Sequence, residues 1–121
     1  MNQLAYLFNL AGRKALITGG NSGIGEAMAR ALGLAGASVV LLARRADLLA
    51  AAAARLAEDQ IDCTTLSAGL TNVGALKAAV DGLLADSGSI DILVNAAGVN
   101  LREPFGQVNE AAWNLHLSLH L

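Results

Sequence analysis

Glycines gather directly after a short apolar segment near the start of the chain. The segment is Lys14–Thr18 (KALIT), and the residues that follow it, 19–25, read GGNSGIG. A glycine-rich turn between a strand and a helix lets backbone N–H groups approach a phosphate, and the helix N-terminus adds partial positive charge at the same place. The pattern therefore predicts an anion site made of backbone atoms. The alternative is a tight turn that only packs the helix on the strand.

Two arginines follow the second apolar run, Ser38–Ala43, and no carboxylate lies between the end of that run and Asp47. In dinucleotide-binding folds an acidic residue at this place takes the ribose hydroxyls of NAD, whereas an arginine accommodates the 2′-phosphate of NADP. Arg44 is the main candidate for that phosphate and Arg45 the second, because a guanidinium binds phosphate in a bidentate manner. NADP(H) is favoured and NAD(H) is the alternative. A pair of solvated arginines at a helix entrance is the competing interpretation.

Strand-like and helix-like segments alternate along the chain, which positions these residues. The expected strands are 14–18, 38–43, 64–67 and 90–95, and the expected helices are 26–34, 47–58, about 73–85 and 109–121. Thr71 or Asn72 is placed to cap the third helix, and Asp47 to cap or complement the second. Such alternation predicts an α/β fold, a doubly wound parallel sheet with right-handed crossovers and helices on both faces.

Composition narrows the functional classes. The chain has 121 residues, which we expect to form one domain, 1–121. A net charge of −2 gives no basis for nucleic-acid binding, and no apolar stretch is long enough to span a membrane. The single cysteine, Cys63, has no partner at metal-ligand spacing, so no metal site is expected. The lone thiol and the absence of a signal-peptide pattern favour the cytoplasm.

Four segments together resemble one family. Thr18–Gly25 matches the pattern T-G-x-x-x-G-x-G, although the strict G-x-G-x-x-G spacing is absent, and Asp91–Gly98 (DILVNAAG) resembles D-I-L-V-N-N-A-G. Leu7–Arg13 resembles the usual lead-in, and Trp113 lies where a tryptophan is common. In order and separation these segments resemble the N-terminal, cofactor-binding half of the short-chain dehydrogenase/reductase family. The resemblance implies a Rossmann-type fold with strand order 3-2-1-4 and an NAD(P)-dependent oxidoreductase acting on a carbonyl or alcohol.

The resemblance also implies roles for individual residues: a phosphate turn, backbone contact with adenine, a hydrogen-bonding asparagine at the sheet centre, and a lining for ribose and nicotinamide. The implied cofactor-binding residues are Thr18, Gly19, Asn21, Ser22, Gly23, Ile24, Gly25, Arg44, Arg45, Leu70, Asn95, Ala96, Ala97 and Gly98. Departures from the pattern are Gly69 in place of an adenine-contacting Asp, Ala96 in place of a second Asn, and His120 in place of the helix Asn. Ser22 replaces a residue that is basic in many NADP-preferring relatives.

The family's catalytic Ser and Tyr-x-x-x-Lys have no counterpart in these residues, since Tyr6 is the only tyrosine and no lysine lies four positions later. We therefore expect a chain truncated after about four β-α units, inactive alone, with a substrate only in a full-length form. A non-catalytic nucleotide-binding or docking module is the alternative, and another doubly wound fold such as flavodoxin is disfavoured. The fourth strand would have an uncovered apolar edge, which predicts self-association.

Overall fold

Strands and helices alternate from residue 14 onward in the computed structural model, which describes residues 6–21, 23–69, 71–97 and 109–120. The elements are β1 (Lys14–Thr18), α2 (Gly23–Leu34), β2 (Ser38–Ala43), α3 (Ala46–Glu58), β3 (Cys63–Ser67), α4 (Val73–Ser87), β4 (Ile92–Asn95) and α5 (Glu110–His120). Among the described residues, no helix is both long and apolar enough to cross a membrane.

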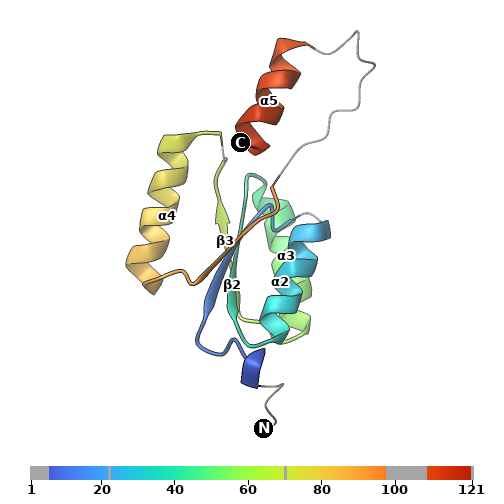
Figure 1. The fold of residues 1–121 in the computed structure, drawn as a ribbon, viewed down its shortest axis with the longest axis vertical. Helices are drawn as coiled ribbons and strands as arrows, with labels where there is room; N and C mark the ends of the chain where they lie inside the picture. Colours follow the sequence, from blue (N-terminus) through green and yellow to red (C-terminus); the bar gives the residue numbers. More distant parts are fainter. Residues whose placement is uncertain (1–5, 22, 70, 98–108, 121) are drawn as a thin grey trace.

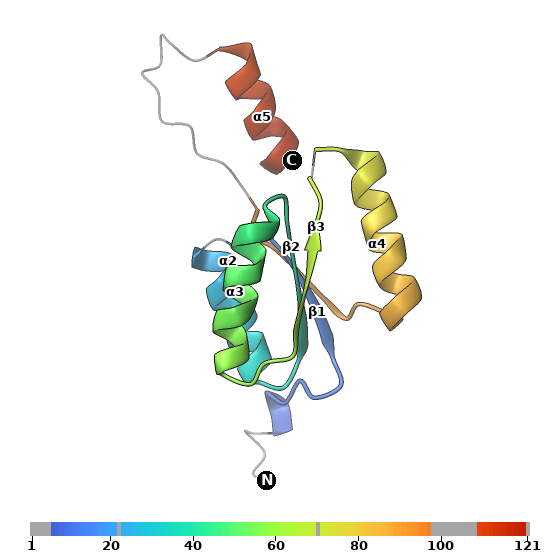
Figure 2. The same cartoon turned by 180° about the vertical axis from the view of Figure 1, so that it is seen from behind.

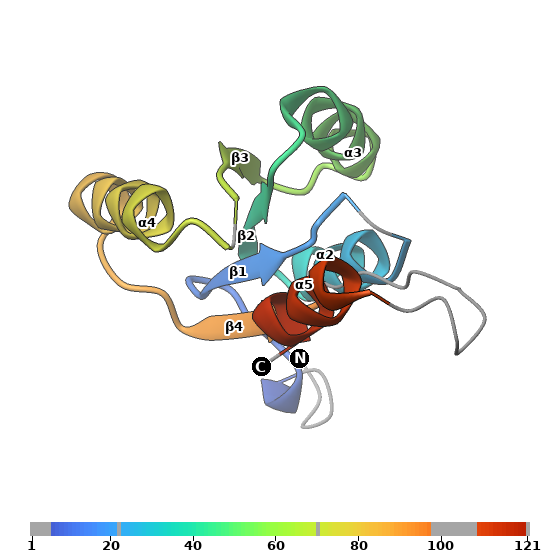
Figure 3. The same cartoon turned by 90° about the horizontal axis from the view of Figure 1, so that it is seen from above.

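The strands form one parallel sheet in the order β3-β2-β1-β4, which is the order that the family resemblance implied. Figure 3, which views the sheet from above, shows the four strands side by side in that order. In the register of the sheet, Ala15 of β1 is paired with Val39 of β2 and with Ile92 of β4. The doubly wound α/β fold is confirmed.

Helices cover both faces of this sheet, with α2 and α3 on one face and α4 on the other (Figures 1 and 2). Side chains alternate between the faces along β1, so Ile17 packs with α2 and α3 while Leu16 packs toward α4. The central strands β1 and β2 are buried on both sides, which explains why they read as continuous apolar runs. Leu76 and Leu83 of α4 complete the second layer.

The outer strands are less covered. β4 pairs with β1 on one side, and among the described residues no strand pairs with its other side. Leu93 of β4 is also 59% exposed, so the face of the sheet is not covered at this side chain either. In Figure 1, α5 lies beyond the carboxyl ends of the strands, and its Trp113 is 62% exposed.

Of the two helix caps expected from the sequence, the structure has the one at Asn72 and lacks the one at Asp47. Asn72 caps α4, as predicted, because its side-chain oxygen accepts a hydrogen bond from the Ala75 N–H at 3.1 Å. Asp47 does not occupy the N-cap position of α3, which belongs to Arg45, and no side chain caps that helix. The other expected role of Asp47, a carboxylate in the first turn, is the one observed.

Candidate functional site

The candidate residues that the structure describes lie at the carboxyl edge of the sheet, where the chain changes direction between strands. From β1 the chain moves outward through β2 to β3, and it then returns to place β4 on the opposite side of β1. In open parallel sheets, ligands bind at the carboxyl ends of the strands beside such a switch point. The glycine-rich turn after β1 and the segment after β4 flank this point.

Gly19 brings these two segments into direct contact. Its φ of +69° is in the left-handed region that glycine tolerates, and its N–H donates to the Leu42 carbonyl at 2.8 Å. A Cβ at this position would lie 2.7 Å from the Cα and the backbone nitrogen of Ala97. Glycine is therefore required here by the fold, whatever binds at the site.

Thr18 and Asn95, the last residues of β1 and β4, are paired in register and joined by hydrogen bonds. The Thr18 hydroxyl, which is buried, donates to the Val94 carbonyl and to Asn95 Oδ1, each at 3.4 Å. The Ala96 N–H donates to the Thr18 carbonyl at 3.1 Å. These contacts hold the segment after β4 beside the glycine turn, which agrees with a structural role for Asn95.

The remaining glycines of the turn differ in their surroundings. Gly20 is packed, since a Cβ there would meet the Leu41 side chain at 2.7 Å, and Gly25 is buried in the first turn of α2. Gly23 begins α2, and a Cβ there would meet nothing within 4 Å. Ile24 beside it is 73% exposed. At Gly23 the N-terminus of α2 therefore has open space in front of it and no side chain to fill that space.

The two arginines after β2 are in different situations. Arg45 is held by Asp47, with Nε to Oδ1 at 3.2 Å and Nη2 to Oδ2 at 2.7 Å, and this contact raises the pKa of Arg45. The Arg44 side chain is exposed and makes no hydrogen bond or ion pair with any described residue. Its backbone is fixed, because the Ser67 hydroxyl donates to the Arg44 carbonyl at 2.9 Å. Arg44 is therefore the more available guanidinium.

The end of β3 lies next in the same edge of the sheet. The Ala68 N–H donates to the Ala43 carbonyl at 2.9 Å, which keeps the two strands together past the sheet ladder. Gly69 follows, and a Cβ there would meet nothing within 4 Å. An aspartate side chain, which the family pattern has at this position, would therefore have room, and packing does not explain why glycine stands here.

Several expected residues lie outside what the structure describes. Ser22, Leu70 and Gly98 are outside the described residues. His120 ends α5, but its side chain and that of His116 are not described. In the described parts of the chain, no cluster of three or more His, Cys, Asp or Glu side chains is arranged to hold a metal ion.

An ion-pair network between α2 and α3, beside the site, was not expected from the sequence. Arg55 of α3 donates to both carboxylate oxygens of Glu26 in α2, at 2.6 to 3.1 Å, and Arg30 of α2 lies 3.5 Å from the same carboxylate. Arg30 also pairs with Asp59 at the end of α3. These contacts hold the pKa of Glu26 below its ordinary value, chiefly through the Arg55 hydrogen bonds. The Glu26 and Arg30 spacing was visible in the sequence, but Arg55 is 29 residues away from Glu26.

Comparison with known proteins agrees with the fold and the motifs. The 5-keto-D-gluconate 5-reductase of Escherichia coli K12 is 39% identical over 111 residues, covering 89% of this chain and 42% of that protein. A solved gluconate 5-dehydrogenase from Burkholderia cenocepacia, in complex with NADP and tartrate, has a TM-score of 0.88 at 34% identity and covers 98% of this chain and 47% of its own. The L-sorbose reductase of Gluconobacter frateurii, complexed with NADPH and L-sorbose, has a TM-score of 0.83 at 32% identity, covering 93% and 43%.

The chain thus spans less than half the length of these relatives. Residues 13–121 match the model of the family described as short chain dehydrogenase. The matched residues include the glycine turn after β1, the segments that follow β2, β3 and β4, and α5. The chain therefore belongs to the short chain dehydrogenase family. It corresponds to the N-terminal Rossmann half of the family's members.

Proposed function

We propose that this chain binds NADP(H) across the carboxyl edge of the sheet, with the pyrophosphate over the N-terminus of α2. The observation that carries the proposal is the bare start of this helix at Gly23, where a Cβ would enter open space. A backbone surface without side chains at a helix N-terminus suits a pyrophosphate. Gly19 supports it by closing the turn after β1 against Ala97, which follows β4, so that the two segments lie together at the carboxyl edge.

The choice of NADP(H) over NAD(H) rests on Arg44. Its exposed guanidinium makes no ion pair with the described residues, and no carboxylate stands at the end of β2 to take the ribose hydroxyls. The solved relatives from Burkholderia cenocepacia and Gluconobacter frateurii hold NADP and NADPH, which agrees with this choice. Arg45 is the second candidate, but its contact with Asp47 would have to open first.

The other contacts of the cofactor follow from this placement. The turn and the start of α2 would hold the pyrophosphate, the segment after β3 would contact adenine, and the segment after β4 would line the ribose and nicotinamide. The residues proposed for these roles are Thr18, Gly19, Asn21, Ser22, Gly23, Ile24, Gly25, Leu70, Asn95, Ala96, Ala97 and Gly98. When bound, the cofactor supplies or accepts the hydride of an oxidoreductase reaction at a carbonyl or alcohol.

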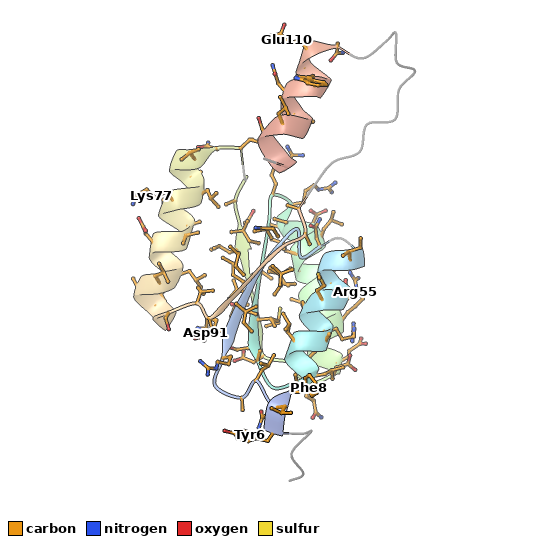
Figure 4. The ribbon with its side chains drawn as sticks, in the orientation of Figure 1. Tyr6, Phe8, Arg55, Lys77, Asp91 and Glu110 are labelled. Atoms are coloured by element: carbon orange, nitrogen blue, oxygen red, sulfur yellow. The ribbon has the colours of Figure 1, made fainter. Side chains whose placement is uncertain are left out.

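We further propose that these 121 residues alone do not complete that reaction. Hydride transfer needs a positioned acid at the substrate oxygen, worth roughly 10²–10⁴ in rate. Tyr6, the only tyrosine in the sequence, precedes β1 and is 75% exposed at the end of the molecule away from the candidate site (Figure 4). No Tyr-x-x-x-Lys is available in the sequence to provide the proton.

Binding and turnover are measured separately to test the proposal. Titration of the chain with NADPH and NADH should give tighter NADPH binding, and Arg44→Ala should remove that preference. NADH binding as tight as NADPH binding and unchanged in Arg44→Ala would contradict the assignment of NADP(H). Turnover of a panel of aldehydes, ketones and sugar alcohols should stay below detection, and turnover that is lost in Gly23→Val would contradict the proposed inactivity.

A second candidate function, a non-catalytic nucleotide-binding or docking module, is favoured by the edge of β4. Leu93 exposes 59% of its surface beside a strand edge that has no partner among the described residues. Such an edge can pair with another strand, so we also propose that the chain self-associates. Light scattering should show oligomers that Leu93→Lys reduces. A sharp monomer for the unsubstituted chain would contradict this.

A further inference from the structure

The network between α2 and α3 contains two cations and two anions. Glu26 and Arg30 belong to α2, and Arg55 and Asp59 come from α3 and its C-cap. Three of the contacts between Arg55 and Glu26 are hydrogen bonds of 2.6, 2.9 and 3.1 Å. The Glu26 side chain is only 16% exposed, whereas the Arg55 side chain is 51% exposed.

Glu26 is in the first turn of α2, directly after Gly25. A carboxylate there interacts favourably with the partial positive charge of the helix N-terminus, and it therefore opposes any anion that binds at the same end. The proposed pyrophosphate site is at that end. An uncompensated Glu26 would lower the affinity of the site for its ligand.

We propose that Arg55 is a positioning residue for cofactor binding, which draws the Glu26 carboxylate against α3 and cancels its charge so that the N-terminus of α2 remains attractive to the pyrophosphate. Arg55 acts through Glu26 and does not touch the cofactor. This inference rests on the proposed binding of NADP(H) and adds a residue from a neighbouring helix to it.

An electrostatic role and a purely structural role of the pair predict different changes in NADPH affinity when Glu26 is substituted. If the pair only ties α2 to α3, removing either partner breaks the same hydrogen bonds and weakens binding alike. If charge matters, Arg55→Gln leaves an uncompensated negative charge near the phosphates, whereas Glu26→Gln leaves none. At a separation of about 10 Å in a partly solvated setting, one unit charge changes the affinity for a pyrophosphate by roughly threefold to tenfold.

The test is the dissociation constant of NADPH for a set of variants, at low salt and at about 0.5 M salt, where charge effects are screened. Arg55→Gln should weaken binding by roughly threefold to tenfold at low salt and less at high salt. Glu26→Gln should bind at least as tightly as the unsubstituted chain, and the double variant Glu26→Gln/Arg55→Gln should return to within about twofold of it. Arg55→Lys keeps the charge and should retain most of the affinity.

Arg13→Gln is the matched control, because it removes one positive charge at the opposite, amino edge of the sheet, where Arg13 lies 3.6 Å from Asp91. Equal weakening in Glu26→Gln and Arg55→Gln, or equal weakening in Arg13→Gln, would overturn the inference while leaving NADP(H) binding intact. No NADPH binding by the unsubstituted chain would overturn both proposals. If Arg55→Gln does not fold, Glu26→Gln decides alone, since any loss of affinity there contradicts an electrostatic role.

Discussion

Replacing Gly19 by alanine should destabilise the fold itself. Its φ of +69° is in the left-handed region, which costs a residue with a Cβ about 1–2 kcal/mol. The new Cβ would also lie 2.7 Å from backbone atoms of Ala97, and overpacking of this kind costs about 1–3 kcal/mol. We therefore expect Gly19→Ala to lower the free energy of unfolding by about 2–5 kcal/mol, which in a domain of this size corresponds to a fall in Tm of at least about 10 °C.

Gly23→Val provides the contrast within the same turn. A Cβ at Gly23 meets nothing within 4 Å, so this variant should keep the Tm of the unsubstituted chain and lose NADPH binding. Gly82→Val is the matched control, since Gly82 is a helical glycine of α4 whose Cβ would also meet nothing within 4 Å. That control should keep both the Tm and the affinity for NADPH.

Thermal unfolding followed by circular dichroism gives the stabilities, and fluorescence titration with NADPH gives the affinities. A Gly19→Ala variant that melts within about 2 °C of the unsubstituted chain, a change equivalent to well under 1 kcal/mol, would contradict a structural need for glycine at this position. Normal NADPH binding by Gly23→Val would contradict the pyrophosphate site, because the turn would then be structural only.

Asp47→Asn should release Arg45 from its carboxylate partner, now at 2.7 Å, and so tighten NADPH binding while leaving NADH binding unchanged. An unaltered ratio of the two dissociation constants would count against Arg45 as a second phosphate ligand. Burial raises the pKa of the Cys63 thiol from 9.0 to about 11. At pH 8 this thiol should therefore react with a disulfide reagent about a hundredfold more slowly in the folded chain than in the unfolded chain, and equal rates would contradict this. The Arg55 hydrogen bonds hold the pKa of Glu26 below 4.5, so the pair stabilises the fold above that pH and the contribution is lost as pH falls through the lowered value. Urea unfolding at about pH 3 and about pH 6 should therefore show a larger acid loss for the unsubstituted chain than for Glu26→Gln, and identical losses would exclude this contribution.

Patterning predicted the central strands to the residue and the outer ones less well. β1 and β2 have the predicted bounds because both are covered on two faces and are apolar nearly throughout. β3 begins one residue earlier than expected, at Cys63, and β4 begins two residues later, at Ile92. These strands are at the edges, where exposed and covered residues alternate and the apolar signal is weaker.

For the candidate site, the sequence indicates the features that depend on neighbouring residues and does not indicate the contacts between distant segments. The motif indicated that glycines are needed in the turn, but the reason for Gly19 is contact with Ala97, which only the sheet brings near. Asp47 was expected at the helix start, yet its bidentate contact with Arg45 depends on side-chain conformation. The contact between Arg55 and Glu26 requires α2 and α3 to lie side by side, which no local pattern indicates.

The most direct test of NADP(H) binding at the carboxyl edge is a map of backbone amide chemical shifts of the labelled chain as NADPH is added. If NADP(H) binds there, the largest changes should be at Gly19, Gly23 and Ala97, with a further change at Arg44 that is smaller with NADH, and none at Gly36 on the amino edge. Changes concentrated at the amino edge, or none at Gly23 under saturating NADPH, would contradict it.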